Sequence, residues 1–245
     1  MSLLSILLQI TDNGPIYAET LTGHKPFVEP WNSLSSLFIA GAGAFFLLKV
    51  KPHQPGKGFI YFAAAMLLIG GIGSTLFHGL RTSSWLVYMD FMPIVIVSVA
   101  VALIFWKRIL HNWPLAIITT FALFALRIAL YQQQNNLNLS AQMLINISYF
   151  ISGVTIFLPC LIFLVNTRFY KSNHLFLAIG LMLLALIFRL IDKDVTEILP
   201  MGTHFLWHVA SGLGAYHMGL YILATMGMDG KKRVGPPNPF PVSED

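Results

Sequence analysis

Long apolar runs constrain the fold of this 245-residue chain more than any other feature. A helix needs about 20 mostly apolar residues to cross the hydrocarbon core of a bilayer. Seven runs approach that length: 31–49, 59–78, 85–106, 113–131, 142–166, 174–191 and 203–226. Only 10% of the residues are charged, whereas soluble domains carry roughly 25%. The sequence therefore predicts an all-α, integral membrane bundle of seven transmembrane helices.

The remaining segments are short, which gives a simple domain organisation. Residues 1–30 form an N-terminal extracytoplasmic segment, and its apolar start is too short to span and suits an interfacial helix. Residues 31–228 form the membrane domain, and the Pro-rich, polar residues 229–245 are expected to be a disordered cytoplasmic tail. The net charge of +5 is scattered over loops, so it does not indicate nucleic-acid binding.

Basic residues are distributed unequally between the loops on the two faces of the predicted bundle. Cytoplasmic loops of membrane proteins carry an excess of Lys and Arg. The face that holds the C-terminus receives ten of them: Lys49, Lys51, Lys57, Lys107, Arg108, Arg168, Lys171, Lys231, Lys232 and Arg233. The other face receives Lys25, Arg81, Lys193 and, at a run end, Arg189. This bias predicts a cytoplasmic C-terminus and an extracytoplasmic N-terminus.

The same topology brings a set of polar residues to one membrane depth on the extracytoplasmic side. Ser74 and His78 end the second run, Asp90 lies early in the third, and His204 and His208 begin the seventh. Titratable side chains are expensive in lipid and are usually functional. These residues were not used to assign the topology, so their convergence favours a site there over a set of packing histidines.

The spacing of the histidines indicates what such a site can bind. A separation of four residues puts His204 and His208 about 40° apart and roughly 6 Å along the axis of one helix. Three imidazoles with one open coordination position are typical of catalytic zinc. We therefore predict that His78, His204 and His208 bind zinc. The alternative is that they are hydrogen-bonded packing residues without a metal.

Two neighbouring residues supply what a zinc hydrolase needs. Asp90 is the candidate general base, and Ser74 can donate a hydrogen bond to a developing oxyanion. Together with zinc they fit hydrolysis of an amide or ester. The site requires the second and seventh runs to approach each other, and both carry small residues that favour close helix packing: Gly70, Gly71 and Gly73, then Ser211, Gly212, Gly214 and Ala215. A proton-coupled transporter is less consistent, because its titratable groups would spread across the membrane depth.

The ordered set of motifs resembles the alkaline ceramidase family, within a superfamily of seven-span zinc hydrolases that includes adiponectin-type receptors and GPI-lipid remodelling proteins. The motifs are Glu29-Pro-Trp-Asn-Ser-Leu-Ser, Gly73-Ser-Thr-Leu-Phe-His78, Asp90 and His204-Phe-Leu-Trp-His208. The resemblance implies hydrolysis of ceramide to a sphingoid base and a fatty acid, with zinc on the three histidines and catalytic roles for Ser74 and Asp90. The runner-up is a receptor-like or other lipid-remodelling member of the superfamily that acts on a different acyl lipid.

The resemblance also implies a second metal and a location. Glu19 and Glu29 match acidic calcium ligands of the family, but Ile16 and Leu21 stand where oxygen donors are expected. Calcium and simple capping or pairing by the two acids therefore both remain open. Ala18 and Thr196 stand where the family has paired cysteines, which favours a bacterial homologue. The active site would face the periplasm in a bacterium, or the lumen of an organelle in a eukaryote.

Overall fold

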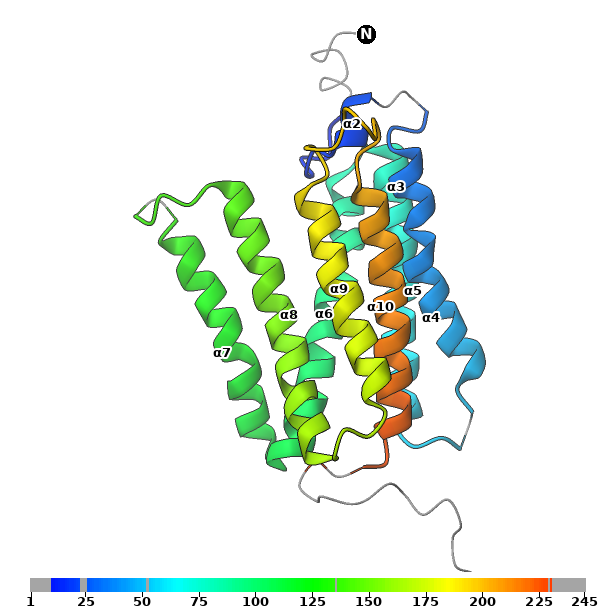
Figure 1. Cartoon of the computed structure of the whole chain (residues 1–245), viewed down its shortest axis with the longest axis vertical. Coiled ribbons are helices and arrows are strands. Elements are labelled where there is room, and N and C mark those ends of the chain that lie inside the picture. The colour runs from blue at the N-terminus through cyan, green and yellow to red at the C-terminus, as the bar shows by residue number, and fades with distance from the viewer. Residues whose placement is uncertain (1–9, 23–25, 52, 135, 229, 231–245) are drawn as a thin grey trace, which may run out of the picture. The chain divides into compact units, whose positions relative to one another are not determined.

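The computed structural model describes residues 10–22, 26–51, 53–134, 136–228 and 230, and over these residues the secondary structure is helical. The predicted all-α class is therefore confirmed. The helices in Figure 1 are α2 (Ala18–Thr22), α3 (Pro30–Ser35), α4 (Leu37–Lys49), α5 (Lys57–Leu80), α6 (Ser84–Leu110), α7 (Trp113–Gln132), α8 (Ala141–Asn166), α9 (Ser172–Leu190) and α10 (His204–Thr225). The predicted interfacial helix and disordered tail fall almost entirely outside the described residues.

Within the described ranges, six helical segments are long and apolar enough to cross a membrane. They are Pro30–Lys49, Lys57–Leu80, Ser84–Leu110, Trp113–Gln132, Asn146–Asn166 and Ser172–Leu190. These segments correspond to the first six predicted runs, and they support a multi-pass membrane protein. The seventh run forms α10, which has 22 residues. Its histidines and glycines lower its mean hydropathy, so α10 is not one of the six, and the seventh span stays a prediction.

The chain divides into two compact units, of which the first comprises residues 1–97 and 176–226. In this unit α4 packs against both α5 and α10 (Figure 1). Glycines allow the close approach: a Cβ on Gly71 of α5 would lie 2.3 Å from the Ala40 nitrogen. One on Gly212 of α10 would lie 2.6 Å from the Phe38 carbonyl carbon. Both contacts are too close for any side chain, so these two positions require glycine.

The other predicted small residues also contact helices different from those we expected. A Cβ on Gly73 would meet Met89 of α6 at 2.6 Å, and one on Gly214 would meet Met182 of α9 at 3.4 Å. The expectation that these glycines bring α5 directly against α10 is therefore wrong. Each glycine packs its helix against another neighbour, and the site residues of α5 and α10 meet through their side chains instead.

The second unit comprises residues 98–175 and 227–245, and its core is apolar. Phe105 of α6 packs edge-on against Phe163 of α8, with ring centroids 5.2 Å apart. Helices α7 and α8 begin at side-chain caps, where Asn112 accepts from the Leu115 N–H and Ser140 accepts from the Met143 N–H.

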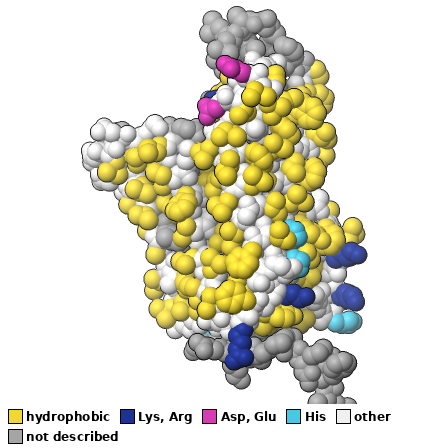
Figure 2. Space-filling view, viewed as in Figure 1, with side chains coloured by type: hydrophobic (Ala, Val, Ile, Leu, Met, Phe, Trp, Pro, Cys, Tyr) yellow, Lys and Arg dark blue, Asp and Glu magenta, His cyan; other side chains and the backbone are white. Residues whose placement is uncertain are grey.

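Large apolar side chains cover much of the surface (Figure 2). In the first unit, for example, Leu48 is 85% exposed and Trp85 is 78% exposed. Exposed apolar area on this scale is unusual for a soluble protein and is expected where helices contact lipid. Charged side chains gather near the helix ends, with acids towards the end of the first unit that carries α2 and basic residues towards the other (Figure 2).

Candidate metal centre

Three buried histidines meet at the end of the first unit where α5 ends and α10 begins. His78 lies in the last turn of α5, His204 is the first residue of α10, and His208 follows one turn later. Their ring centroids are 4.7 to 5.4 Å apart. One potential ligand atom from each lies within 4.8 Å of the others, and all three residues are at most 2% exposed. The structure thus brings together the three residues that the sequence predicted, in a group that can hold a metal ion.

The ring nitrogens of this cluster indicate that it needs a ligand. Among the described residues, His78 Nε2, His204 Nδ1 and both nitrogens of His208 are buried without a hydrogen-bond partner. Leaving one such group unsatisfied costs about 1–3 kcal/mol, so orphaned buried atoms of this kind are rare in native proteins. A single cation would bind one nitrogen of each imidazole, which accounts for three of these four atoms. A set of three imidazole nitrogen donors suits a transition-metal ion, of which zinc is one.

Glu29 orients the imidazole of His78 through a hydrogen bond to the ring nitrogen Nδ1. Its Oε2 accepts a hydrogen bond from His78 Nδ1, and its backbone N–H donates to the His78 carbonyl oxygen over 3.1 Å. Asn32 Nδ2 also donates to Oε2, over 2.9 Å. With the proton on Nδ1, the lone pair of Nε2 is left facing the cluster. Metal-binding histidines usually have a carboxylate or carbonyl partner of this kind.

The charge of Glu29 is set by its surroundings. Burial by itself would raise its pKa, but the charges of His78 and Arg81 and hydrogen bonds from His78 and Thr20 outweigh that effect. The pKa of Glu29 is lowered to about 2 as a result. The carboxylate is therefore ionised at neutral pH, which it must be to accept both the His78 and the Arg81 protons.

His204 is held differently, through its backbone and its ring face. Asp192 Oδ1 accepts the N–H groups of Thr203 and His204 over 2.9 and 2.8 Å, which caps the start of α10. Gly202, with φ +70°, allows the chain to turn here, since a Cβ at that position would lie 2.3 Å from Asp192 Oδ1. The ring of Tyr17 stacks on the His204 imidazole with centroids 3.8 Å apart.

Ser74 and Asp90, the predicted catalytic residues, lie beside the histidines. Ser74 is buried one turn before His78 on α5, and its Oγ is 2.8 Å from Ser36 Oγ. Asp90 is partly exposed on α6; Ser74 is its hydrogen-bond partner and His78 its strongest charged neighbour. The structure thus places both residues next to one candidate metal ligand.

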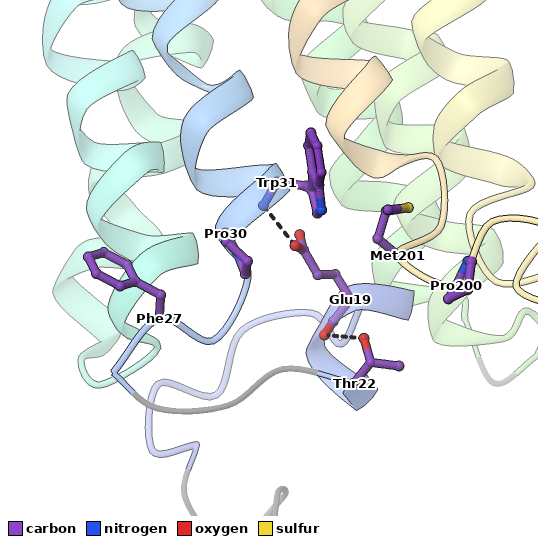
Figure 3. A pocket seen from close by; sticks show the side chains of 7 residues that line it. All are labelled: Glu19, Thr22, Phe27, Pro30, Trp31, Pro200 and Met201. Carbon is purple, nitrogen blue, oxygen red and sulfur yellow. Dashed lines mark hydrogen bonds between the residues drawn. The ribbon is translucent and has the colours of Figure 1, made fainter.

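Glu19 caps a helix. Its two carboxylate oxygens accept the backbone N–H groups of Trp31 and Asn32, over 2.7 and 2.9 Å, at the start of α3. Burial is the main cause of a raised pKa for Glu19, although these two N–H groups act in the opposite direction. Glu19 also borders a cavity of about 370 Å³ (Figure 3), whose lining is mostly apolar: Glu19, Thr22, Phe27, Pro30, Trp31, Pro200 and Met201.

These contacts bear on the calcium prediction without testing it. The carboxylates of Glu19 and Glu29 are both hydrogen-bonded to donors of the chain, as the capping and pairing alternative expects. Within the described residues, His78, His204 and His208 form the only group of His, Cys, Asp and Glu side chains with metal-ligand geometry. Calcium at the two glutamates stays a prediction.

Several residues of the site were not predicted from the sequence. Arg81 is counted from the sequence only as a loop charge, yet it is fully buried and paired with Asp12 and Glu29. Asp192 caps the start of α10, a role that no sequence feature indicates, and Tyr17 likewise carries no signal. The position of Arg81, three residues after His78, is the one sequence feature that could have drawn attention to it.

No protein-family model matches the sequence, and no curated protein is similar to it. The resemblance to alkaline ceramidases thus depends on the short motifs alone.

Proposed function

We propose that this chain is a multi-pass membrane zinc hydrolase that cleaves the amide bond of ceramide or a closely related acyl lipid. The observation that carries the proposal is the buried cluster of His78, His204 and His208, with four ring nitrogens that have no partner among the described residues. A carboxylate behind one ligand and a second, partly exposed carboxylate beside it are what a hydrolytic site requires in addition. Ceramide as the substrate comes from the motif resemblance.

Zinc, when bound to the three imidazoles, supplies a Lewis acid that makes a water molecule nucleophilic near neutral pH. In our proposal Asp90 accepts the proton of the attacking water and returns it to the departing amine. The partial exposure of Asp90 beside His78 supports this role. Glu29 would keep His78 in the tautomer that leaves Nε2 free to bind a metal ion.

Ser74 is proposed to stabilise the negative charge that develops on the carbonyl oxygen. Its partner Ser36 donates its own proton to the Asn32 carbonyl oxygen over 2.8 Å. Ser74 Oγ thus has two partners, Ser36 Oγ and Asp90, and a rotation about one side-chain bond can redirect its proton towards a substrate. The arrangement supports Ser74 as a hydrogen-bond donor, because its described partners are the Ser36 hydroxyl and the Asp90 carboxylate.

The membrane arrangement is proposed to include α10 as a seventh span. At about 1.5 Å per residue, a helix of this length covers the hydrocarbon core. Acids gather towards the α2 end of the first unit (Figure 2), whereas Lys49 ends α4 and Lys57 begins α5 at the other end. This segregation supports an extracytoplasmic N-terminus. The histidine cluster would then open near the extracytoplasmic face, where a lipid can reach it laterally.

The test is an assay of purified full-length protein in lipid nanodiscs against a panel of acyl lipids. The panel contains ceramides of several chain lengths, an N-acyl ethanolamine and a diacylglycerol, with fatty acid release measured by mass spectrometry. We expect release from ceramide that a chelator removes and added zinc restores. The variant His208→Ala should be inactive, while His217→Ala, a histidine of the same helix outside the cluster, should stay active. Zinc-bound protein that hydrolyses no member of the panel would contradict the proposal and favour a receptor.

A further inference from the structure

A single arginine lies at the centre of the charged residues behind the metal site. Arg81 is fully buried, and its guanidinium lies over the Phe77 ring, 4.7 Å from the centroid. Its Nε and Nη2 donate to the two oxygens of Asp12 over 2.6 and 3.0 Å. Its Nη1 donates to Glu29 Oε1 and to Thr20 Oγ1. One buried cation thus pairs with two buried carboxylates.

These contacts connect directly to a metal ligand. The other oxygen of Glu29 accepts the proton of His78 Nδ1, so Asp12, Arg81, Glu29 and His78 form one continuous series. Arg81 follows His78 by three residues and ends α5 in the left-handed conformation, with φ 52°. That conformation is unfavourable for residues other than glycine, so the ion pairs must stabilise it. The left-handed conformation of Arg81 ends α5 and turns the chain, while the guanidinium stays buried beside Glu29.

The series also holds the N-terminal segment against the bundle. The Thr11 side chain donates to the Thr82 carbonyl oxygen over 2.9 Å, and Ser84 donates to the Asp12 carbonyl oxygen over 3.0 Å. Tyr17, which stacks on His204, belongs to the same segment, and its N–H donates to Thr20 Oγ1. The segment that covers two of the three imidazoles is therefore fixed through Arg81 and its partners.

We infer that Arg81 is a positioning residue of the metal centre, which keeps Glu29 in the orientation that presents His78 Nε2 to the ion. The inference rests on the proposed metal site. Without the guanidinium, Glu29 Oε1 and both oxygens of Asp12 would lose their cationic partner inside the protein, and buried unpaired charge is strongly unfavourable. Glu29 would then move towards water, and it would no longer hold His78 as an acceptor.

The ion pairs of Arg81 also affect whether calcium can bind at Glu29. Arg81 already provides a positive charge at Glu29 and Asp12, the two carboxylates at this position. A divalent cation at Glu29 would have to displace the guanidinium from Oε1. We therefore expect zinc binding and any turnover to be unchanged by a chelator selective for calcium.

The inference is tested by titrating Co²⁺, a spectroscopic substitute for zinc, into the metal-free full-length protein in detergent. The visible absorption of Co²⁺ reports affinity and ligand geometry without any activity measurement. We compare the wild type with Arg81→Met, Glu29→Gln and the double variant. Arg108→Met, which removes a guanidinium bonded to the Met228 carbonyl oxygen in the other unit, is the control.

Support for His78 from its partner is expected to be worth about 10- to 100-fold in metal affinity. Glu29→Gln and Arg81→Met should each show a loss of that order, and Arg81→Met should add little in the Glu29→Gln background. Wild-type affinity in Arg81→Met, or losses that multiply in the double variant, would overturn the inference. If the wild type binds no Co²⁺ at all, the metal site itself is wrong, which is a separate and distinguishable result.

Arg81→Met can fail to fold, because it leaves two buried carboxylates unpaired. Arg81→Lys keeps the charge but cannot bond both carboxylates in the planar fork of a guanidinium, and Asp12→Asn keeps Arg81 while weakening its anchor. Each should fold and lose metal affinity by a smaller factor, with the loss absent in the Glu29→Gln background. Unchanged Co²⁺ affinity in both variants would overturn the inference without the methionine variant.

Discussion

The two helices that supply the metal ligands support them in different ways. On α5, the imidazole of His78 is held by a carboxylate that bonds its ring nitrogen, and that carboxylate is paired with Arg81. On α10, Asp192 holds the backbone of His204, and the ring is restrained by the face of Tyr17. The α5 ligand is therefore fixed by charge and the α10 ligands by the start of their helix. Changes on the α5 side should act on metal binding, and changes on the α10 side on stability.

The largest expected effect is the loss of the metal ion when one histidine ligand is substituted on either helix, because the proposed site needs ligands from both α5 and α10. His78→Ala and His204→Ala each leave two of three protein ligands, which is fewer than a catalytic zinc site has. Zinc content, measured by plasma mass spectrometry on purified protein, should fall from about one per chain to background in both variants. Stoichiometric zinc in either variant would show that the substituted histidine is not a required ligand, and the three-ligand site would be wrong.

The next effect separates binding from catalysis. Asp90→Asn should retain zinc, because Asp90 is not among the three ligands, and should lose about 10²- to 10⁴-fold in the rate of lipid hydrolysis. Zinc content and turnover are measured on the same preparation. Turnover close to that of the wild type would remove Asp90 as the general base, and loss of zinc would make it part of the metal site.

A comparison of Asp192 with Glu29 tests directly whether the two helices support their metal ligands in different ways. Asp192→Ala removes the acceptor of three backbone N–H groups, those of Ala18, Thr203 and His204. We expect a loss of about 1–2 kcal/mol in the free energy of unfolding, as for other helix caps. Its effect on Co²⁺ affinity should be smaller than that of Glu29→Gln, whose main effect is on the metal. The reverse order of the two variants in affinity would show that the α10 support acts on the ligands themselves.

The smallest effect concerns the ring stack on His204. Tyr17→Leu keeps an apolar side chain of similar burial but removes the aromatic face, at a cost of about 0.5–1.5 kcal/mol for the aromatic pair. Thermal unfolding of the metal-free protein measures it. Tyr17→Phe is the matched control, because it keeps the ring and should stay nearer to the wild type. A loss in Tyr17→Phe as large as that in Tyr17→Leu would show that the hydroxyl, and not the stack, holds the segment.

The apolar runs predict the helices well because a bilayer demands length and hydrophobicity, which can be read residue by residue. The six spans of the structure begin and end within a few residues of the runs from 31 to 191. The three histidines are also predictable, since imidazoles in apolar helices are costly and their depth follows from the topology. The agreement reflects physical constraints that act along the sequence.

The residues that support the histidines could not be predicted, because their contacts join parts of the chain that are far apart in the sequence. Asp12 and Arg81 are separated by 69 positions, and Asp192 and Ala18 by 174. No periodicity links residues so far apart, and a charge near a helix end is usually exposed. The glycines are a second example. The sequence indicates that they allow close helix packing, but it does not say which helix each one contacts. The structure places both Gly71 and Gly212 against α4.

X-ray absorption at the zinc edge of the wild-type protein tests the central claim most directly, because it reports the atoms around the ion. We predict a first shell of three imidazole nitrogens at about 2.0–2.1 Å with one further oxygen, as in a catalytic zinc site. A shell without imidazole scattering, or a purified protein that takes up no zinc, would contradict the claim that His78, His204 and His208 form the metal centre.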